Sequence, residues 1–262
     1  MHNISALLFD LDGTVYRGTN AIPGASDFIA TLKERNIPFL FVTNRGNRHP
    51  SAVADQLVSM GIPCTEDDVL TSAQAVAMGL EPGTKVYCVG EEPLKSTLTE
   101  AGMVIVENTA DHEADAVVVS YDRGVNYEKL SNALRFIDKG ARFIATNTDR
   151  LITVEDGILP EAGPLVAAVQ AATNKEPEIF GKPEKPIMDA ALKRIGKPAD
   201  QCAIIGDNLF TDILAGHKAG MKSILILTGV ANRKDGEHAE YKPTWIAEDY
   251  KDLADILFEQ SN

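Results

Sequence analysis

Short apolar runs alternate along this chain with longer segments of helical period, and this alternation limits the accessible folds more than any other feature. Four of the runs end at a polar residue or glycine, at residues 5–9, 38–42, 202–205 and 223–227. Their continuous apolar character is typical of strands buried on both faces. The segments 25–35 and 186–195 repeat apolar residues at helical spacing. The pattern predicts an α/β fold with a doubly wound, parallel, Rossmann-type sheet.

The middle of the chain contains enough further strands for a second domain. Three more β-prone runs lie at residues 85–89, 116–119 and 141–145. Loop-like stretches at 81–84 and 174–177 flank this region. We therefore predict a discontinuous core domain over residues 1–80 and 180–262, with an inserted α/β domain over residues 81–179.

Charge and cysteine content argue against several classes of protein. The chain has 38 acidic and 25 basic residues, a net charge of −13, so we expect no nucleic-acid partner. Its three cysteines are far apart and lack a C-x-x-C spacing, which favours a reducing, cytoplasmic location over a disulfide framework or a zinc site. No apolar run approaches the roughly 18 residues of a membrane span, so we expect no membrane partner.

The segment Asp10-Leu11-Asp12-Gly13-Thr14 follows the first predicted strand directly. Because side chains alternate along a strand, Asp10 and Asp12 can project to one side at its carboxyl end, where open α/β sheets bind ligands. Two carboxylates there repel each other without a cation, and Mg²⁺ prefers oxygen ligands of this kind. Taken alone, the segment also fits a strand end with an Asx-type turn.

Two further segments offer groups that suit a phosphate. Thr43 and Asn44 follow the second apolar run, and their hydroxyl, amide and backbone N–H groups are neutral donors for phosphoryl oxygens. Lys182 lies just before the helix predicted from residue 186, so its ammonium has a defined starting point. Each group alone would fit an ordinary strand terminator or a surface lysine.

A second pair of carboxylates, Asp207 and Asp212, follows the apolar run at 202–205. Gly206 lies between that run and Asp207, and a glycine allows another part of the backbone to approach closely. In isolation the two residues could be a capping and a solvated aspartate. Four compatible segments in this order are far more specific than any one of them.

The segments DLDGT, VTN, GKP and GDNLFTD resemble the four motifs of the haloacid dehalogenase (HAD)-like hydrolases. The long insertion between the second and the third resembles the large α/β cap of the NagD-like, 4-nitrophenylphosphatase branch, in which dimers formed through the cap are common. The resemblance covers essentially the whole chain. It implies a HAD-like core with an inserted cap and a phosphatase of small metabolites.

Carried over by position, the resemblance implies a role for each motif residue. Asp10 would be the nucleophile that forms an aspartyl-phosphate. Asp12 would be the general acid that protonates the leaving group and then deprotonates the attacking water. Thr43 and its neighbour Asn44 would bind the transferring phosphoryl group, and Lys182 would neutralise charge on the nucleophile and the phosphoryl oxygens.

The resemblance also implies a magnesium site. The ion would be held by the Asp10 carboxylate, the Asp12 backbone carbonyl and Asp207, while Asp212 would support the metal shell or Lys182. This agrees with the chemistry, because an ionised carboxylate approaches a phosphate dianion only when positive charge screens the two.

Selectivity is expected to reside in the inserted domain, which would close over the leaving group. The candidate contacts are Asp122 and Arg123 after one strand, and Asn147 and Asp149 after the next. Arg45 stands near the second motif, where many relatives have asparagine, and could reach an anionic or polyol substrate. Each of these residues also fits an ordinary polar turn or a solvated loop.

We therefore predict a Mg²⁺-dependent phosphomonoester hydrolase of small phosphorylated metabolites such as sugar phosphates or nucleoside monophosphates, with 4-nitrophenyl phosphate as an artificial substrate. The chain has no G-x-G, which argues against a dinucleotide-binding protein. Two alternatives stay open. One is a phosphotransferase or phosphomutase that uses the same aspartyl-phosphate, and the other is a non-enzymatic aspartyl-phosphate switch.

Overall fold

The computed structural model describes residues 4–107, 113–154 and 157–258. Contacts divide the chain into two compact units. The first unit comprises residues 1–43, 50–70 and 182–262, and the second comprises residues 44–49 and 71–181. Residues 71–80 thus fall in the second unit, although the sequence placed the boundary after residue 80. The assignment of core and cap roles to these ranges stays a prediction.

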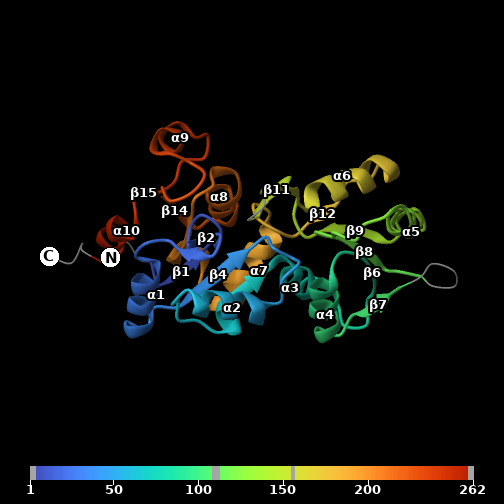
Figure 1. Ribbon diagram of the computed structural model, residues 1–262, viewed down its shortest axis with the longest axis horizontal. Coiled ribbons are helices and arrows are strands. Elements are labelled where there is room, and N and C mark those ends of the chain that lie inside the picture. Colours follow the sequence, from blue (N-terminus) through green and yellow to red (C-terminus); the bar gives the residue numbers. More distant parts are fainter. Residues whose placement is uncertain (1–3, 108–112, 155–156, 259–262) are drawn as a thin grey trace. The chain divides into compact units, whose positions relative to one another are not determined.

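The first unit is built on a six-stranded sheet in the order β15-β14-β13-β1-β4-β5 (Figure 1). β1 pairs in parallel with β13 and β4, and β14 pairs in parallel with β13 and β15. The strands are β1 (Ala6–Phe9), β4 (Phe39–Thr43), β5 (Val69–Thr71), β13 (Cys202–Gly206), β14 (Lys222–Ile226) and β15 (Trp245–Ala247). A small antiparallel pair joins β2 (Tyr16–Arg17) to β3 (Asn20–Ala21).

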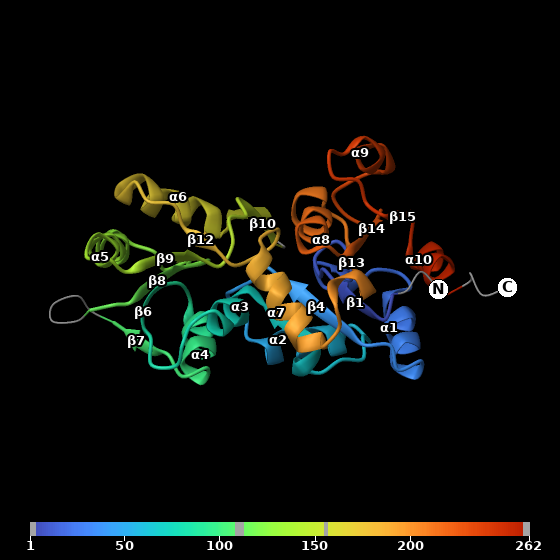
Figure 2. The ribbon, with the colours of Figure 1, turned by 180° about the vertical axis from the view of Figure 1, so that it is seen from behind.

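Helices cover both faces of this sheet. Leu7 and Phe9 of β1 pack in one apolar cluster with α1, α2 and α10, while Ala6 and Leu8, which point the other way, are also fully buried. On that second side α7 packs on β4 and on α8 (Figure 2). The helices are α1 (Ala25–Glu34), α2 (Pro50–Ser59), α7 (Lys185–Ile195), α8 (Leu214–Ala219), α9 (Arg233–His238) and α10 (Tyr250–Phe258). This burial on both faces explains the continuous apolar runs.

The second unit has its own parallel sheet, in the order β12-β9-β8-β6-β7. Helices α5 and α6 cover one face and α4 covers the other (Figures 1 and 2). The strands are β6 (Lys85–Val89), β7 (Val104–Val106), β8 (Ala116–Val119), β9 (Arg142–Ala145) and β12 (Glu178–Ile179), with an antiparallel hairpin of β10 (Leu151–Val154) and β11 (Gly157–Pro160). The helices are α3 (Ser72–Met78), α4 (Glu92–Glu100), α5 (Tyr127–Asp138) and α6 (Ala162–Thr173).

The predicted fold class is confirmed, since both units are α/β with parallel sheets. Each strand predicted for the first sheet lies within a residue or two of its expected position, because the apolar run itself defines it. Single-turn segments complete the first unit at Glu66–Asp68, at Ala199–Gln201 and, in π-helical form, at Leu209–Ile213. In the part of the chain that the structure describes, no helix is both long and apolar enough to cross a membrane.

Candidate active site

Three carboxylates meet at the carboxyl ends of two neighbouring parallel strands of the first unit. Asp10 follows β1, and Asp207 and Asp212 follow β13, which pairs with β1. Each residue offers a carboxylate oxygen, and these oxygens all lie within 4.8 Å of one another. Among the described residues, this is the group of acidic side chains that could hold a metal ion.

Lys182 inserts its ammonium into this cluster. Its Nζ lies 2.5 Å from Asp10 Oδ1 and 2.8 Å from Asp212 Oδ1, and the residue is only 3% exposed. Burial opposes the charge on Lys182, but the two carboxylates more than offset this effect, so its pKa is raised. The lysine therefore remains an ammonium ion over the physiological pH range.

The net charge of the cluster matches that of one divalent cation. Three carboxylates and one ammonium leave a formal excess of two negative charges in a largely buried place. Burial, followed by the charge of Asp10, raises the pKa of Asp207 to about 6. Clustered oxygen ligands with this charge are what Mg²⁺ requires. The residues present therefore fit the metal that the sequence predicted.

The two aspartates after β13 have different partners. Asp212 receives hydrogen bonds on both oxygens, from Lys182 Nζ and, at 3.2 Å, from the backbone N of Asn208. Asp207 accepts from the backbone N of Val230 at 2.7 Å and from Thr14 Oγ1 at 3.4 Å. Asp212 thus contacts Lys182 and also belongs to the acidic cluster, so both roles named for it from the sequence stay predictions.

The tight approach of Asp212 depends on Gly206 and on the π-helical turn. A Cβ atom on Gly206 would lie 2.3 Å from the Cβ of Asp212, closer than two carbon atoms can approach. The extra residue of the π turn over Leu209–Ile213 carries Asp212 back over the strand end. The sequence predicted a close approach of backbone at Gly206, and the structure places the Asp212 side chain there instead. The π turn was not predicted.

Asp12 and Thr43 lie at the ends of the adjacent strands β1 and β4. Asp12 is exposed, and its Oδ2 accepts a hydrogen bond from Tyr16 Oη at 3.2 Å. Thr43, the last residue of β4, is 2% exposed. Because β1 and β4 pair in parallel, their carboxyl ends lie at the same edge of the sheet.

Asn44 and Arg45 begin the segment 44–49, which belongs to the second unit. Asn44 is almost buried, and its Nδ2 donates to Asp149 Oδ2 at 3.0 Å. Its backbone oxygen accepts from Asn147 Nδ2 at 2.8 Å. Arg45 is half-buried. Asn44, from the second motif, therefore forms one hydrogen-bonded group with Asn147 and Asp149, from the segment after β9.

Asp122 and Arg123, the other two candidate substrate contacts, form ion pairs and hydrogen bonds within the second unit. Asp122 is 4% exposed, lies 2.7 Å from Lys129 Nζ and accepts from the backbone N of Gly124. The Arg123 side chain is 72% exposed and pairs with Glu91 Oε1 at 2.6 Å. Asp122 has the contacts of a loop-forming residue, and Arg123 is accessible.

Glu161, a buried carboxyl group of the second unit, was not among the residues predicted from the sequence to have a role. Its side chain accepts from the backbone N of Ala162 at the start of α6 and is 5% exposed. Burial is the main cause that raises its pKa to about 7, and nearby Asp149 adds to the effect, while a hydrogen bond from Asn147 and the charge of Arg45 oppose it. Only the fold brings these groups around residue 161.

We expect Glu161 to make the stability of the protein depend on pH. Its native pKa of about 7 lies above the ordinary value of 4.5, so the native state holds a proton that the unfolded chain has released between these values. The stabilisation is present at low pH and is lost as pH rises through about 7. The gain in the free energy of unfolding on Glu161→Gln should be about 2 kcal/mol larger at pH 8 than at pH 5.

Urea unfolding at the two pH values measures this difference. Glu176→Gln, at an exposed position of the same unit, is the control and should show almost no pH-dependent difference. An equal effect of Glu161→Gln at both pH values would mean that Glu161 is already ionised at pH 5.

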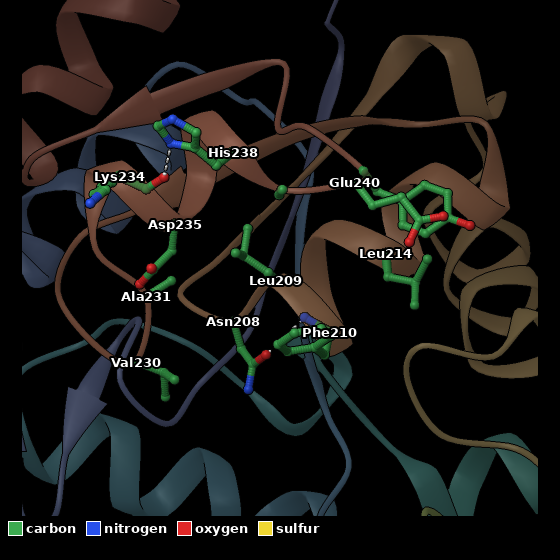
Figure 3. Close-up of a pocket in the computed structure, with 12 residues that line it drawn as sticks. Asn208, Leu209, Phe210, Leu214, Val230, Ala231, Lys234, Asp235, His238 and Glu240 are labelled. Atoms are coloured by element: carbon green, nitrogen blue, oxygen red, sulfur yellow. Dashed lines mark hydrogen bonds between the residues drawn. The ribbon is translucent and has the colours of Figure 1, made fainter.

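The loops that hold Asp207 and Asp212 also form one wall of an open pocket of about 720 Å³ (Figure 3). Phe210, from the π turn, is 79% exposed, and Val230, whose backbone N binds Asp207, is 75% exposed. The far wall comes from α9 and the segment after it. The apolar Leu209-Phe210 pair inside the fourth motif was the available signal for this pocket, and the sequence reasoning missed it.

Comparison with known proteins agrees with this geometry. A family model described as "Haloacid dehalogenase-like hydrolase" matches residues 7–104, and one described as "HAD-hyrolase-like" matches residues 179–253. The 5'-nucleotidase YutF of Bacillus subtilis (strain 168) is 41% identical over 247 residues, which are 93% of this chain and 95% of that protein. This chain belongs to the haloacid dehalogenase-like hydrolases.

Other relatives of this HAD-like chain are also phosphatases. The acid sugar phosphatase of Staphylococcus saprophyticus is 39% identical and is covered over 99% of both chains. A double mutant of the thermostable NPPase of Geobacillus stearothermophilus superposes with a TM-score of 0.88 at 39% identity, over 96% of this chain and 98% of that one. Glycerol phosphate phosphatase Rv1692 of Mycobacterium tuberculosis, in complex with magnesium, gives 0.87 at 36% identity, over 96% and 76%. The chain is a phosphatase-type member of the NagD-like branch.

Proposed function

We propose that this HAD-like protein is a Mg²⁺-dependent phosphomonoester hydrolase that forms an aspartyl-phosphate on Asp10. The observation that carries the proposal is the arrangement of Lys182 between Asp10 and Asp212, beside Asp207, with two negative charges in excess. Such a site attracts a divalent cation and, with it, a phosphate dianion. The expected substrates are small phosphorylated metabolites, either sugar phosphates or nucleoside monophosphates, as the names of the relatives suggest.

The reaction divides into two transfers. An Asp10 carboxylate oxygen attacks phosphorus, the bond from phosphorus to the leaving oxygen breaks, and Asp12 gives its proton to that oxygen. Asp12 then takes a proton from water, and the hydroxide oxygen attacks phosphorus. The bond from phosphorus to the Asp10 oxygen breaks, which releases inorganic phosphate, restores the Asp10 carboxylate and leaves Asp12 protonated, as it was before the first transfer. The exposed position of Asp12 beside Tyr16 suits a group that exchanges protons.

Positive charge and neutral donors make the first attack feasible. Lys182 lowers the repulsion between the Asp10 carboxylate and the phosphoryl oxygens. Thr43 and Asn44 supply hydroxyl, amide and backbone donors to those oxygens. Asp10, the backbone carbonyl of Asp12 and Asp207 would hold Mg²⁺. When bound, the ion supplies charge neutralisation for the dianion.

Release of inorganic phosphate from 4-nitrophenyl phosphate tests the proposal. Multiple turnovers are expected with Mg²⁺, and excess chelator should reduce them at least about 100-fold, because the uncompensated negative charge then repels the dianion. Re-addition of Mg²⁺ should restore the rate. Turnover that chelator leaves unchanged would contradict the metal requirement.

The same assay separates the two alternatives. Wild-type protein that becomes labelled on Asp10 once per molecule, with a phosphate that hydroxylamine releases, but does not turn over would indicate an aspartyl-phosphate switch. Turnover that appears only when a second metabolite is added would indicate a phosphotransferase or phosphomutase. A panel of sugar phosphates and nucleoside monophosphates then identifies the substrate, and light scattering tests for the dimer through the inserted domain that is common in the NagD-like branch.

A further inference from the structure

The segment 44–49 follows Thr43 directly. The main chain of its first residue, Asn44, is hydrogen-bonded to other elements of the second unit. The backbone oxygen of Asn44 accepts two hydrogen bonds, from Ser72 Oγ at 2.6 Å and from Asn147 Nδ2 at 2.8 Å. The Asn44 side chain donates to Asp149 Oδ2 at 3.0 Å. Ser72 is the first residue of α3, and Asn147 and Asp149 follow β9. Three hydrogen bonds, from the start of α3 and from the segment after β9, therefore hold Asn44 in place.

Close packing fixes the next part of the same segment. A Cβ atom on Gly46 would lie 2.8 Å from Ser120 Oγ and 3.1 Å from both Ser72 Oγ and Thr146 Cγ2. Ser120 and Thr146 lie just beyond β8 and β9, and their hydroxyl oxygens are 2.9 Å apart. The backbone at Gly46 thus rests directly on these strand ends and has no space to shift towards them.

Asn147 has no surface with which to contact a substrate. It is 0% exposed, although the sequence nominated it as a contact for the leaving group. Its amide nitrogen donates to Asn44 O and its amide oxygen accepts from the backbone N of Asp149 at 2.9 Å. Its side chain also hydrogen-bonds the buried Glu161. Its hydrogen-bonding groups are therefore committed to other parts of the second unit.

We propose that Asn147 is a positioning residue, which fixes the backbone of Asn44 and thereby the phosphate-binding segment Thr43-Asn44, and that it does not select the leaving group. This inference rests on the proposed function, in which Thr43 and Asn44 bind the phosphoryl group. It follows that a change at residue 147 should affect the phosphoryl group common to all substrates. Misplacement of such donors by about 1 Å can cost up to about 100-fold in rate.

The test compares substrates that share only the phosphate. For Asn147→Ala we expect kcat/KM to fall about 10- to 100-fold for 4-nitrophenyl phosphate, for a sugar phosphate and for a nucleoside monophosphate alike. The ratios among the three should stay within about twofold of the wild type. A loss confined to one substrate, with the others unchanged, would overturn the proposal and restore Asn147 as a substrate-reading residue.

Two variants separate positioning from general loss of stability. Asn132→Ala removes another buried asparagine of the second unit, on α5, whose amide interacts with Arg135 and not with the segment 44–49. Its kcat/KM values should stay within about twofold of the wild type. Ser72→Ala removes the other hydrogen bond to Asn44 O and should repeat the uniform loss to a smaller extent, so it provides the test if Asn147→Ala does not fold.

Binding of inorganic phosphate, measured calorimetrically in the presence of Mg²⁺, gives a readout that does not depend on turnover. We expect Asn147→Ala to weaken phosphate binding by about the same factor as kcat/KM, while Asn132→Ala leaves it unchanged. Unchanged phosphate binding in folded Asn147→Ala would overturn the inference. Wild-type protein that binds phosphate but hydrolyses none of the three esters would count against the proposed hydrolase, and the binding comparison would still decide the role of Asn147.

Discussion

Replacement of Asp10 by asparagine is expected to lower the turnover of 4-nitrophenyl phosphate by at least about 10⁴-fold without unfolding the protein. The amide has the shape of the carboxylate but is neutral and is not a nucleophile, so no aspartyl-phosphate can form. Its oxygen can still accept a hydrogen bond from Lys182, which also keeps its contact with Asp212. The free energy of unfolding should therefore change by no more than about 1 kcal/mol.

Steady-state kinetics, urea unfolding and acid quench of the labelled enzyme together check this result. After the acid quench, the wild type should carry a phosphate that alkali or hydroxylamine releases from the peptide that contains Asp10, and the variant should carry none. Asp189→Asn, on the exposed side of α7, is the matched control and should retain wild-type turnover. Residual turnover of more than about 1% in pure Asp10→Asn would remove Asp10 from the nucleophile's role.

Replacement of Lys182 by methionine is expected to abolish turnover and to lower the free energy of unfolding by about 3–5 kcal/mol at pH 8. The ammonium is buried between Asp10 and Asp212, so its loss leaves two carboxylates without their common partner. The pKa of Lys182 is raised above its ordinary value of 10.5, so its contribution is fully present at pH 8 and would be lost only as pH rises above that value.

The comparison should use chelator-treated protein. A bound cation would neutralise the unpaired carboxylates and so hide part of the loss in the free energy of unfolding. The deficit should be smaller at pH 6 than at pH 8, because the unpaired carboxylates then take up protons in the native state. Lys182→Met with Asp212→Asn should recover a substantial part of the stability, because one buried charge is gone. Lys218→Met, which breaks an exposed pair with Glu184, should cost less than about 1 kcal/mol. A similar small cost for Lys182→Met would contradict a buried ion pair.

Much of the sheet architecture could be predicted, because a buried parallel strand is a local feature of sequence. The runs that became β1, β4, β13 and β14 are apolar at nearly every buried position, with Thr43 and Ser223 as the polar exceptions. The positions of Asp10 and Asp207 at one sheet edge followed from parallel pairing alone. The π turn over Leu209–Ile213 was not predicted, since it carries no apolar run bounded by turn residues. The hairpin of β10 and β11 was missed although the β-prone run Leu151–Val154 precedes Gly157.

The role of a polar residue depended instead on contacts that sequence spacing does not reveal. Asn147 and Glu161 are ordinary polar residues in the sequence, yet both are buried and bonded to groups far along the chain or in other elements. The sequence alone determined the α/β class, the HAD-like motifs and the order of the candidate catalytic groups, because these depend on local pattern. Only the tertiary structure decided that Lys182 lies between Asp10 and Asp212 and that Asn147 donates to the backbone of Asn44, because these partners lie 172, 30 and 103 positions away along the chain and no local pattern pairs them.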